Sequence, residues 1–219
     1  MHGASAARCA ASFAHEHCMA KRVFDLCLAS LALLLVVPLM LLIGLCIKLD
    51  SSGPVFYRQQ RVGRYGALFR IHKFRTMQHN PRDAGAQITV GGDARITRVG
   101  EFLRGSKLDE LAQLIDVMQG TMSLVGPRPE VPRYVAHYPA DLRSKLLSVR
   151  PGITDMASLT FHNESELLAQ SEDPDQEYVQ VLMPKKLALA AQYVDAASLR
   201  LDVKILWRTL CLLLSPAKR

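Results

Sequence analysis

The sequence is poor in aromatic residues and lacks the cysteine spacings of disulfide-rich or zinc-binding proteins. Phe, Trp and Tyr make up 6% of its 219 residues, and no aromatic RNA-binding pattern, helix-turn-helix or zinc finger is evident. The five cysteines show no close metal-type spacing, which fits a reducing cytoplasmic compartment. Residues 1–20 lack the apolar core of a signal peptide. Together these absences argue against a secreted disulfide scaffold and against the common nucleic-acid-binding modules.

What is abundant is apolar and basic. The apolar fraction is 49%, and the formal net charge is +7 with a pI near 9.3. A basic excess indicates an anionic partner, which can be nucleic acid, anionic lipid or a phosphorylated ligand. The positive charge is concentrated between residues 58 and 107, where few acids oppose it. The basic residues there are Arg58, Arg61, Arg64, Arg70, Lys73, Arg75, Arg82, Arg95, Arg98, Arg104 and Lys107.

The N-terminal region divides into a polar tail and an apolar run. Residues 1–20 are Ala-, His- and Ser-rich without apolar periodicity, and we predict a disordered tail. Residues 23–47 are long and apolar enough to be a transmembrane candidate. Pro38 interrupts this run, and basic residues flank both of its ends, which suits a helix that bends and returns to the cytoplasmic face. A single crossing remains an equal alternative on physical grounds.

The remaining chain predicts an α+β fold with helix in excess. Val55–Gln60 and Leu68–Phe74 read as two strands around a turn at residues 63–66, which together form a β-hairpin. Residues 78–97 have the composition of a mobile loop. Helical patterns cover residues 98–104, 107–118, 139–148, 175–195 and 198–214. The last of these is either an interfacial membrane helix with Trp207 as its anchor or an ordinary helix packed on the core.

Two adjacent acids, Asp109 and Glu110, have two explanations. If Ser106 is an N-cap, Asp109 falls at the third helical position and completes a capping box. The other explanation is chemical, because Asp109, Gln113 and Asp116 share one helix face and Arg104 lies just upstream. Capping patterns are common, so the acids alone favour the structural explanation.

Two Arg-Pro loops shift the balance towards chemistry. Arg128 lies between Pro127 and Pro129, and Arg150 precedes Pro151. Proline fixes the neighbouring backbone, so a guanidinium beside it is held at low entropic cost. A held guanidinium binds phosphate through two parallel hydrogen bonds. One such loop would be an ordinary rigid turn, but two together indicate a phosphorylated ligand.

Several short motifs follow one another from about residue 20 to the C-terminus. They are Lys21–Asp25, Gly53–Gly63, Lys73–Met77, Leu103–Arg104, Leu108–Leu111, Met122–Glu130 and Arg150–Thr154. In these motifs and in their order, the sequence resembles the bacterial sugar transferase family, the monotopic polyprenyl-phosphate phosphoglycosyl transferases. The resemblance implies a re-entrant membrane helix that turns at Pro38, with Asp109 as the nucleophile. It also implies Glu110 as the second member of a catalytic dyad and Mg²⁺ held by the two acids.

The sequence departs from the family pattern at five places. Val37 replaces a frequent Ser, and Ala112 replaces the Pro of the dyad helix. Asp116 replaces an Asn, and Thr121 replaces an acid. The segment Asp155–Ser158 replaces Gly-Trp-Ala-Gln, and this last difference lies where a donor pocket would be lined.

The resemblance implies a reaction and its partners. A sugar 1-phosphate would pass from a UDP-sugar to undecaprenyl phosphate at the cytoplasmic face of the inner membrane, the initiating step of exopolysaccharide or lipopolysaccharide biosynthesis. Candidate phosphate- and nucleotide-binding residues are Lys73, Arg75, Arg104, Arg128 and Arg150. Residues 21–48 would form the membrane helix and 49–219 the catalytic domain. No nucleic-acid partner is expected. The alternatives are a non-catalytic scaffold of the same fold and a membrane-attached nucleic-acid binder, and the oligomeric state stays open, a homodimer included.

Overall fold

The computed structural model describes residues 3–79 and 93–215. Residues 80–92, the centre of the predicted mobile loop, lie outside the described part, while Met77 and Ile96 on either side of it form an isolated antiparallel bridge. The fold is helix-rich with three two-stranded sheets among the described residues, in agreement with the predicted α+β class. The strands are β1 (Phe56–Tyr57), β2 (Gln60–Val62), β3 (Leu68–Arg70), β4 (Lys73–Phe74), β5 (Ser123–Val125) and β6 (Gly152–Thr154).

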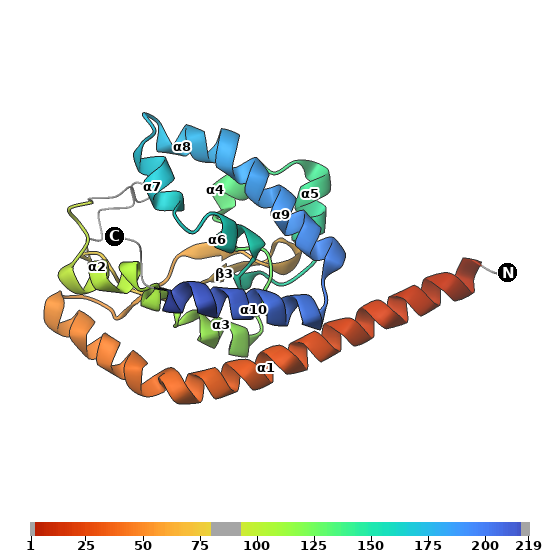
Figure 1. Cartoon of the computed structure of the whole chain (residues 1–219), viewed down its shortest axis with the longest axis horizontal. Helices are drawn as coiled ribbons and strands as arrows, with labels where there is room; N and C mark the ends of the chain where they lie inside the picture. Colours follow the sequence, from red (N-terminus) through yellow and green to blue (C-terminus); the bar gives the residue numbers. More distant parts are fainter. Residues whose placement is uncertain (1–2, 80–92, 216–219) are drawn as a thin grey trace.

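Helices surround these strands (Figure 1). The α-helices are α1 (Gly3–Asp50), α2 (Arg98–Gly105), α3 (Gln113–Gln119), α4 (Pro132–Val135), α5 (Ala140–Leu146), α6 (Met156–Thr160), α7 (Glu164–Ala169), α8 (Pro174–Glu177), α9 (Met183–Ala196) and α10 (Leu199–Leu214). Short 3₁₀ turns are η1 (Arg64–Gly66) and η2 (Leu108–Glu110), and a π-helical turn, η3 (Tyr178–Leu182), joins α8 to α9.

The long helix α1 begins earlier than predicted. Residues 3–20, expected to form a disordered tail, are helical and continue directly into the apolar run. Alanine recurs through this segment, and it has the highest helix propensity of any residue. Pro38 lies inside α1, and Figure 1 shows that the helix is bent and that its last part curves up beside α2. A proline removes one helical hydrogen bond and favours such a bend.

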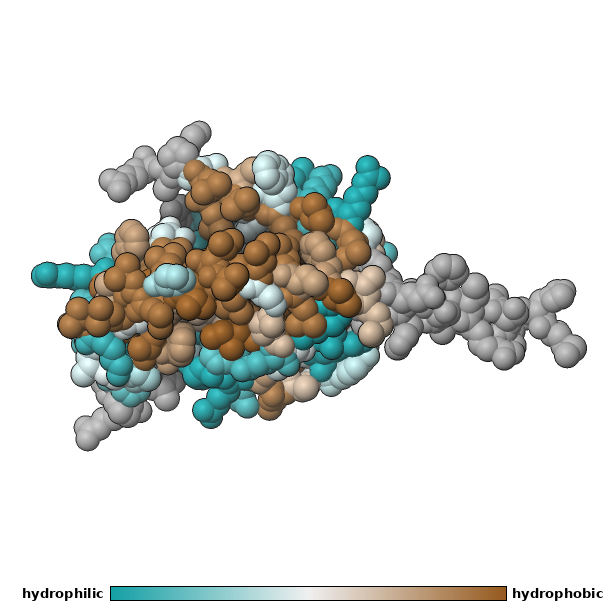
Figure 2. All heavy atoms as spheres, turned by 90° about the horizontal axis from the view of Figure 1, so that it is seen from below, coloured by the Kyte–Doolittle hydropathy of each residue, from teal (hydrophilic) through white to brown (hydrophobic). Residues whose placement is uncertain are grey.

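Met19–Asp50 is long and apolar enough to cross a membrane by length and composition. Most of its large apolar side chains are exposed, and α10 exposes several more, including Trp207. Figure 2 shows the resulting hydrophobic face, seen from the side along which α1 runs. Water-facing helices do not carry so broad an apolar surface, so this face is a candidate membrane contact.

Polar contacts attach the middle of α1 to the rest of the chain. Asp25 accepts a hydrogen bond from the Ser123 hydroxyl at 2.7 Å, and Lys21 pairs with Asp202 of α10 at 2.7 Å. Asp202 is fully buried and also accepts from the Tyr193 hydroxyl at 2.7 Å. The position of α1 relative to α10 and β5 is therefore set by charges as well as by packing.

The predicted β-hairpin is confirmed. Residues 56–57 pair with 73–74, and residues 60–62 pair with 68–70, both antiparallel. The turn between them contains Tyr65 and Gly66 with positive φ angles of 58° and 79°. The hairpin brings Lys73, at the start of β4, back towards the middle of the molecule.

The predicted helix over residues 107–118 is broken. Ser106 closes α2 as its C-cap, and its hydroxyl donates to the carbonyl of Phe102 at 2.7 Å. Lys107 then adopts a left-handed conformation with φ 57°, so the chain turns before η2 begins. Ser106 is consequently not an N-cap, and the capping-box explanation of Asp109 is wrong.

A parallel pair of short strands lies at the centre of the core. Ser123 of β5 aligns with Gly152 of β6, and Val125 aligns with Thr154. Val125 and Val117 are fully buried and pack with Ala29 of α1 in one apolar cluster. Because the strands are parallel, the segments that follow them leave at the same edge, and one of these segments carries Arg128.

Candidate active site

Asp109 lies in η2 as a buried carboxylate with one oxygen unused. The residue is 2% exposed, and its Oδ2 is 2.9 Å from Nζ of Lys73. Its Oδ1 is buried and has no hydrogen-bond partner among the described residues. A buried acceptor without a partner costs free energy, so such an atom indicates a ligand or a reacting group.

Glu110 is held by two cations. Arg128 donates to both of its carboxylate oxygens, through Nη1 to Oε2 at 3.2 Å and through Nη2 to Oε1, and Lys73 lies 3.4 Å away. Burial alone would raise the pKa of Glu110, but the charges of Arg128 and Lys73 outweigh it and hold the pKa well below its usual range. The Glu110 carboxylate in turn raises the pKa of Arg128. The pair is therefore fully charged at neutral pH.

The loop that carries Arg128 is fixed by the parallel strand pair. Gly126 donates its N–H to the Thr154 carbonyl at 3.1 Å, and Gly152 donates to the Pro127 carbonyl at 3.0 Å. A Cβ on Gly126 would lie 2.5 Å from the Arg150 carbonyl oxygen, so only glycine permits this approach. The two Arg-Pro motifs are thus neighbours. The segment that follows Arg150 holds the backbone of Gly126 and Pro127, and the Arg128 side chain projects from that backbone.

Lys73 and Arg104 complete the positive surroundings of the dyad. Lys73 reaches both carboxylates from β4, as the two distances above show. Arg104 comes from α2 and donates through Nε to the Thr76 hydroxyl at 2.8 Å. Burial lowers the pKa of Arg104, and the nearby charge of Asp109 partly opposes that shift. The structure thus brings Asp109, Glu110, Lys73, Arg104 and Arg128 together.

Two predicted phosphate-binding arginines lie outside this cluster. Arg75 donates to the carbonyls of Ser51 and Ser52 at 2.7 and 2.6 Å, where α1 ends. Arg150 donates through Nε to the Gly120 carbonyl at 2.8 Å, just after α3. Both side chains donate to backbone carbonyls at helix ends, which stabilises those ends. A phosphate-binding role for either arginine stays a prediction.

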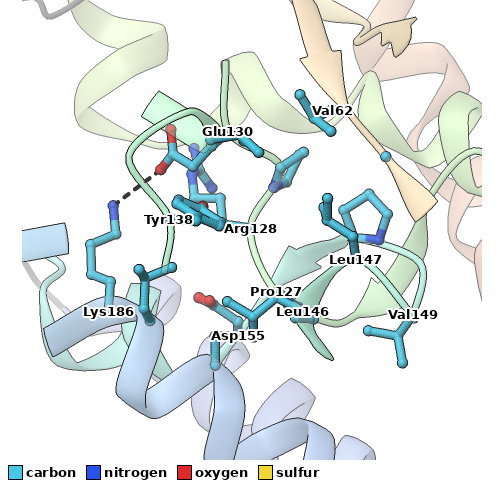
Figure 3. A pocket seen from close by; sticks show the side chains of 16 residues that line it. Val62, Pro127, Arg128, Glu130, Tyr138, Leu146, Leu147, Val149, Asp155 and Lys186 are labelled. Carbon is cyan, nitrogen blue, oxygen red and sulfur yellow. Dashed lines mark ion pairs between the residues drawn. The ribbon is translucent and has the colours of Figure 1, made fainter. Parts of the chain in front are cut away.

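A small cavity of about 40 Å³ lies on the other side of Arg128. Figure 3 shows Arg128, Glu130, Asp155 and Lys186 around it, and Lys186 pairs with Glu130 at 3.7 Å. Asp155 is the N-cap of α6 and accepts from the N–H of Ser158 at 2.7 Å. Asp155, the first residue of the segment that departs from the family pattern, therefore borders the Arg128 loop. The sequence did not single out Lys186, because a lysine on an amphipathic helix reads as solvated.

The residues present fit a hard cation. Magnesium in proteins is usually bound through one or two carboxylates, with waters and substrate phosphate oxygens completing its octahedral shell. Oδ1 of Asp109 has no partner among the described residues, and the adjacent Glu110 would bind such an ion by exchanging Arg128 or Lys73 for it. The described residues contain no group of three or more His, Cys, Asp and Glu side chains placed to hold a metal, so substrate oxygens would supply the remaining ligands.

The chain is similar to known proteins over most of its length. Residues 16–216 match the family described as bacterial sugar transferase. A relative from Caulobacter vibrioides, a "UDP-glucose:undecaprenyl-phosphate glucose-1-phosphate transferase", is 39% identical over 208 residues, covering 89% of this chain and 70% of the relative. "Exopolysaccharide production protein ExoY" of Rhizobium meliloti is 36% identical over 207 residues, covering 88% and 84%.

A third relative is longer than this chain. The "UDP-N-acetylgalactosamine-undecaprenyl-phosphate N-acetylgalactosaminephosphotransferase" of Aeromonas hydrophila is 38% identical over 192 residues, which are 87% of this chain and 42% of the relative. The chain therefore spans less than half of that protein but most of the Caulobacter and Rhizobium relatives. The names of the Caulobacter and Aeromonas relatives give different sugars, so similarity alone does not select a donor.

Proposed function

Since the chain belongs to the bacterial sugar transferase family, we propose that it transfers a sugar 1-phosphate from a UDP-sugar to undecaprenyl phosphate. The products are undecaprenyl-diphospho-sugar and UMP, and the reaction would initiate a surface polysaccharide at the cytoplasmic face of the inner membrane. The names of the relatives support the reaction class. The observation that carries the proposal is the buried carboxylate of Asp109. Its Oδ2 contacts Lys73, while its Oδ1 has no hydrogen-bond partner among the described residues.

Asp109 is the proposed nucleophile. Its Oδ1 attacks the β-phosphorus of the UDP-sugar, a bond forms between them, and the bond to the bridging oxygen breaks so that UMP leaves. An aspartyl phosphosugar remains. A phosphate oxygen of undecaprenyl phosphate then attacks the same phosphorus and releases the Asp109 carboxylate. Carboxylates act as phosphoryl-accepting nucleophiles in other enzymes, and two steps replace one difficult one.

The neighbouring charges reduce the repulsion between anions. Each attack brings a negative oxygen to a phosphate, so neutralisation of charge is the main task of such a site. Lys73 orients the Asp109 carboxylate through Oδ2 and leaves Oδ1 available. Arg128 and Arg104 face the same region and would stabilise charge on the transferred phosphate. Held at the dyad through a Glu110 oxygen, so that Oδ1 of Asp109 stays free to attack, Mg²⁺ would supply further neutralisation of the phosphate oxygens.

The two substrates require a site at the membrane surface. The UDP-sugar is water-soluble, whereas the prenyl chain stays in the bilayer. We propose that α1 enters one leaflet, bends at Pro38 and returns, while Trp207 and the exposed apolar side chains of α10 lie at the interface. Cysteines placed near Met19 and near Ser51 would then react from the same side of sealed vesicles. Reaction from opposite sides would contradict re-entry.

The deciding experiment measures UMP release by purified protein in detergent, with undecaprenyl phosphate, Mg²⁺ and a panel of UDP-sugars. Lipid-dependent release with one donor supports the reaction and identifies the sugar. Asp109→Asn should lower the rate by roughly a thousandfold or more, as expected for loss of a nucleophile. Near-normal turnover by a folded Asp109→Asn protein would rule out the covalent route. Silence of the wild type across the panel would favour a non-catalytic scaffold.

A further inference from the structure

A second buried acid, Asp116, forms hydrogen bonds with His72, the residue that precedes Lys73. Asp116 is 1% exposed and lies in α3, two turns after Asp109. Its Oδ2 accepts from the backbone N–H of His72 at 2.8 Å, and its Oδ1 lies 2.7 Å from Nδ1 of the His72 ring. Both carboxylate oxygens of Asp116 therefore contact His72, and both residues are buried.

The far side of the His72 ring decides which nitrogen carries the hydrogen. Nε2 of His72 contacts Nη1 of Arg58. A guanidinium can only donate, so Nε2 accepts and Nδ1 carries the hydrogen that it donates to Asp116. Phe56 packs edge-on against the ring, with centroids 5.8 Å apart. Arg58, His72 and Asp116 thus form a chain of directed hydrogen bonds with one arrangement.

Two acids of the η2–α3 segment contact two consecutive residues where β4 begins. Asp109 contacts Lys73, and Asp116 contacts His72, the residue directly before it. β4 has two residues and, among the described strands, pairs with β1 alone, so its ladder gives little restraint along the strand direction. The lysine side chain has many rotamers and loses much entropy when its ammonium is held in one place. A fixed backbone at residue 72 reduces the range over which that ammonium has to search.

We propose that Asp116 and His72 are positioning residues, which hold Lys73 so that its ammonium orients the Asp109 carboxylate. The inference rests on the proposed function, because it assigns these residues a part in the proposed transfer. Beside His72, an amide at position 116 cannot make both contacts, since it has one acceptor oxygen and would point donor hydrogens at a second donor. The acid at 116 and the histidine at 72 therefore act as a matched pair.

The test compares four single variants in the UMP-release assay, with the full chain in detergent. Asp116→Asn and His72→Leu should lower kcat by roughly tenfold to a hundredfold, while KM for the UDP-sugar stays within about twofold, because misplacement of a catalytic group by about 1 Å has effects of this size. His72→Asn keeps a donor near the position of Nδ1 and should retain most of the activity. Asp202→Asn is the matched control, since Asp202 is equally buried and hydrogen-bonded but joins α1 and α10. Its kcat per folded molecule should equal that of the wild type.

A second readout does not depend on turnover. The rate at which Lys73 is acylated by an amine reagent, followed by mass spectrometry, should rise in Asp116→Asn and His72→Leu and stay unchanged in Asp202→Asn. This result would hold even if the wild type released no UMP, so failure of the proposed function is distinguishable from failure of the inference. Equal Lys73 acylation in all four variants, an equal loss of kcat in Asp116→Asn and Asp202→Asn, or a change confined to KM would overturn it.

Discussion

Cationic side chains from other parts of the chain lie at both ends of α3, but they contact different kinds of partner. At the end where the chain enters α3, Lys73 and Arg128 contact the carboxylates of Asp109 and Glu110. At the other end, the cations contact backbone carbonyls: Arg22 donates to Val117 and Met118 at 2.8 and 3.3 Å, and Arg150 donates to Gly120 at 2.8 Å. Cations at a helix C-terminus satisfy free carbonyls and favour the helix dipole.

The difference lies in whether the partner can be exchanged. The side-chain carboxylate of Glu110 can turn away when a phosphate arrives, so Arg128 would remain available to a substrate. A backbone carbonyl at a helix end cannot turn away in the same manner, so a cation that leaves it removes a hydrogen bond from the end of the helix. An arginine beside a proline can therefore have either role. What differs is whether its partner is a side-chain carboxylate or a backbone carbonyl.

The largest expected effect belongs to the entry end. Arg128→Lys should lower kcat for UMP release by roughly a hundredfold or more, because a lysine is a single point of charge and cannot pair with Glu110 through two parallel bonds. The measurement is steady-state UMP release with saturating undecaprenyl phosphate. Lys145→Arg, at an exposed ion pair with Asp195, is the matched control and should leave kcat unchanged. An Arg128→Lys enzyme with wild-type kcat would mean that Arg128 only holds the loop.

An intermediate effect belongs to Arg150, and it should fall on stability. Arg150→Met removes the donor to the Gly120 carbonyl and should lower the free energy of unfolding by about 1–2 kcal/mol, the usual effect of stranding a partly buried acceptor. The kcat of folded molecules should stay within about threefold of the wild type. The two readouts are thermal unfolding and UMP release on the same preparation. A loss of kcat as large as that of Arg128→Lys would restore the phosphate-binding role that the sequence predicts.

The sequence predicted elements well where local chemistry decides them. The hairpin at residues 56–74 and the helices α2, α5 and α10 follow from periodicity and turn residues, and the structure confirms them. The helix predicted over residues 175–195 is divided into α8, the π-helical turn η3 and α9. The break before η2 was missed because Lys107 adopts a left-handed conformation, which sequence rules assign to glycine or asparagine. No local pattern marks a lysine for that conformation.

The candidate site divides in the same way. The family motifs predicted Asp109, Glu110, Lys73, Arg104 and Arg128, and the structure brings them together. Their catalytic roles stay a proposal. The sequence also predicts Arg75 and Arg150 as phosphate-binding residues. In a sequence, an arginine that binds phosphate cannot be told from one that contacts a backbone carbonyl. The partners of these two arginines, at Ser51 and Gly120, are 24 and 30 residues away along the chain. Only the tertiary fold shows that these partners are carbonyls.

The smallest expected effect tests the exit end of α3 through Gly120. This residue has φ 84°, and an added Cβ would lie 3.3 Å from Nη2 of Arg22. Gly120→Ala should therefore destabilise the protein by about 1 kcal/mol, from backbone strain in the left-handed conformation, with kcat unchanged. Gly105→Ala is the control: that residue ends α2, has no neighbour within 4 Å of an added Cβ, and should raise the unfolding midpoint slightly or leave it unchanged. Differential scanning fluorimetry of both variants gives the comparison. If Gly120→Ala lowered kcat while the midpoint stayed constant, the exit end would reach the active site through α3, and the two ends would have to be treated as one unit.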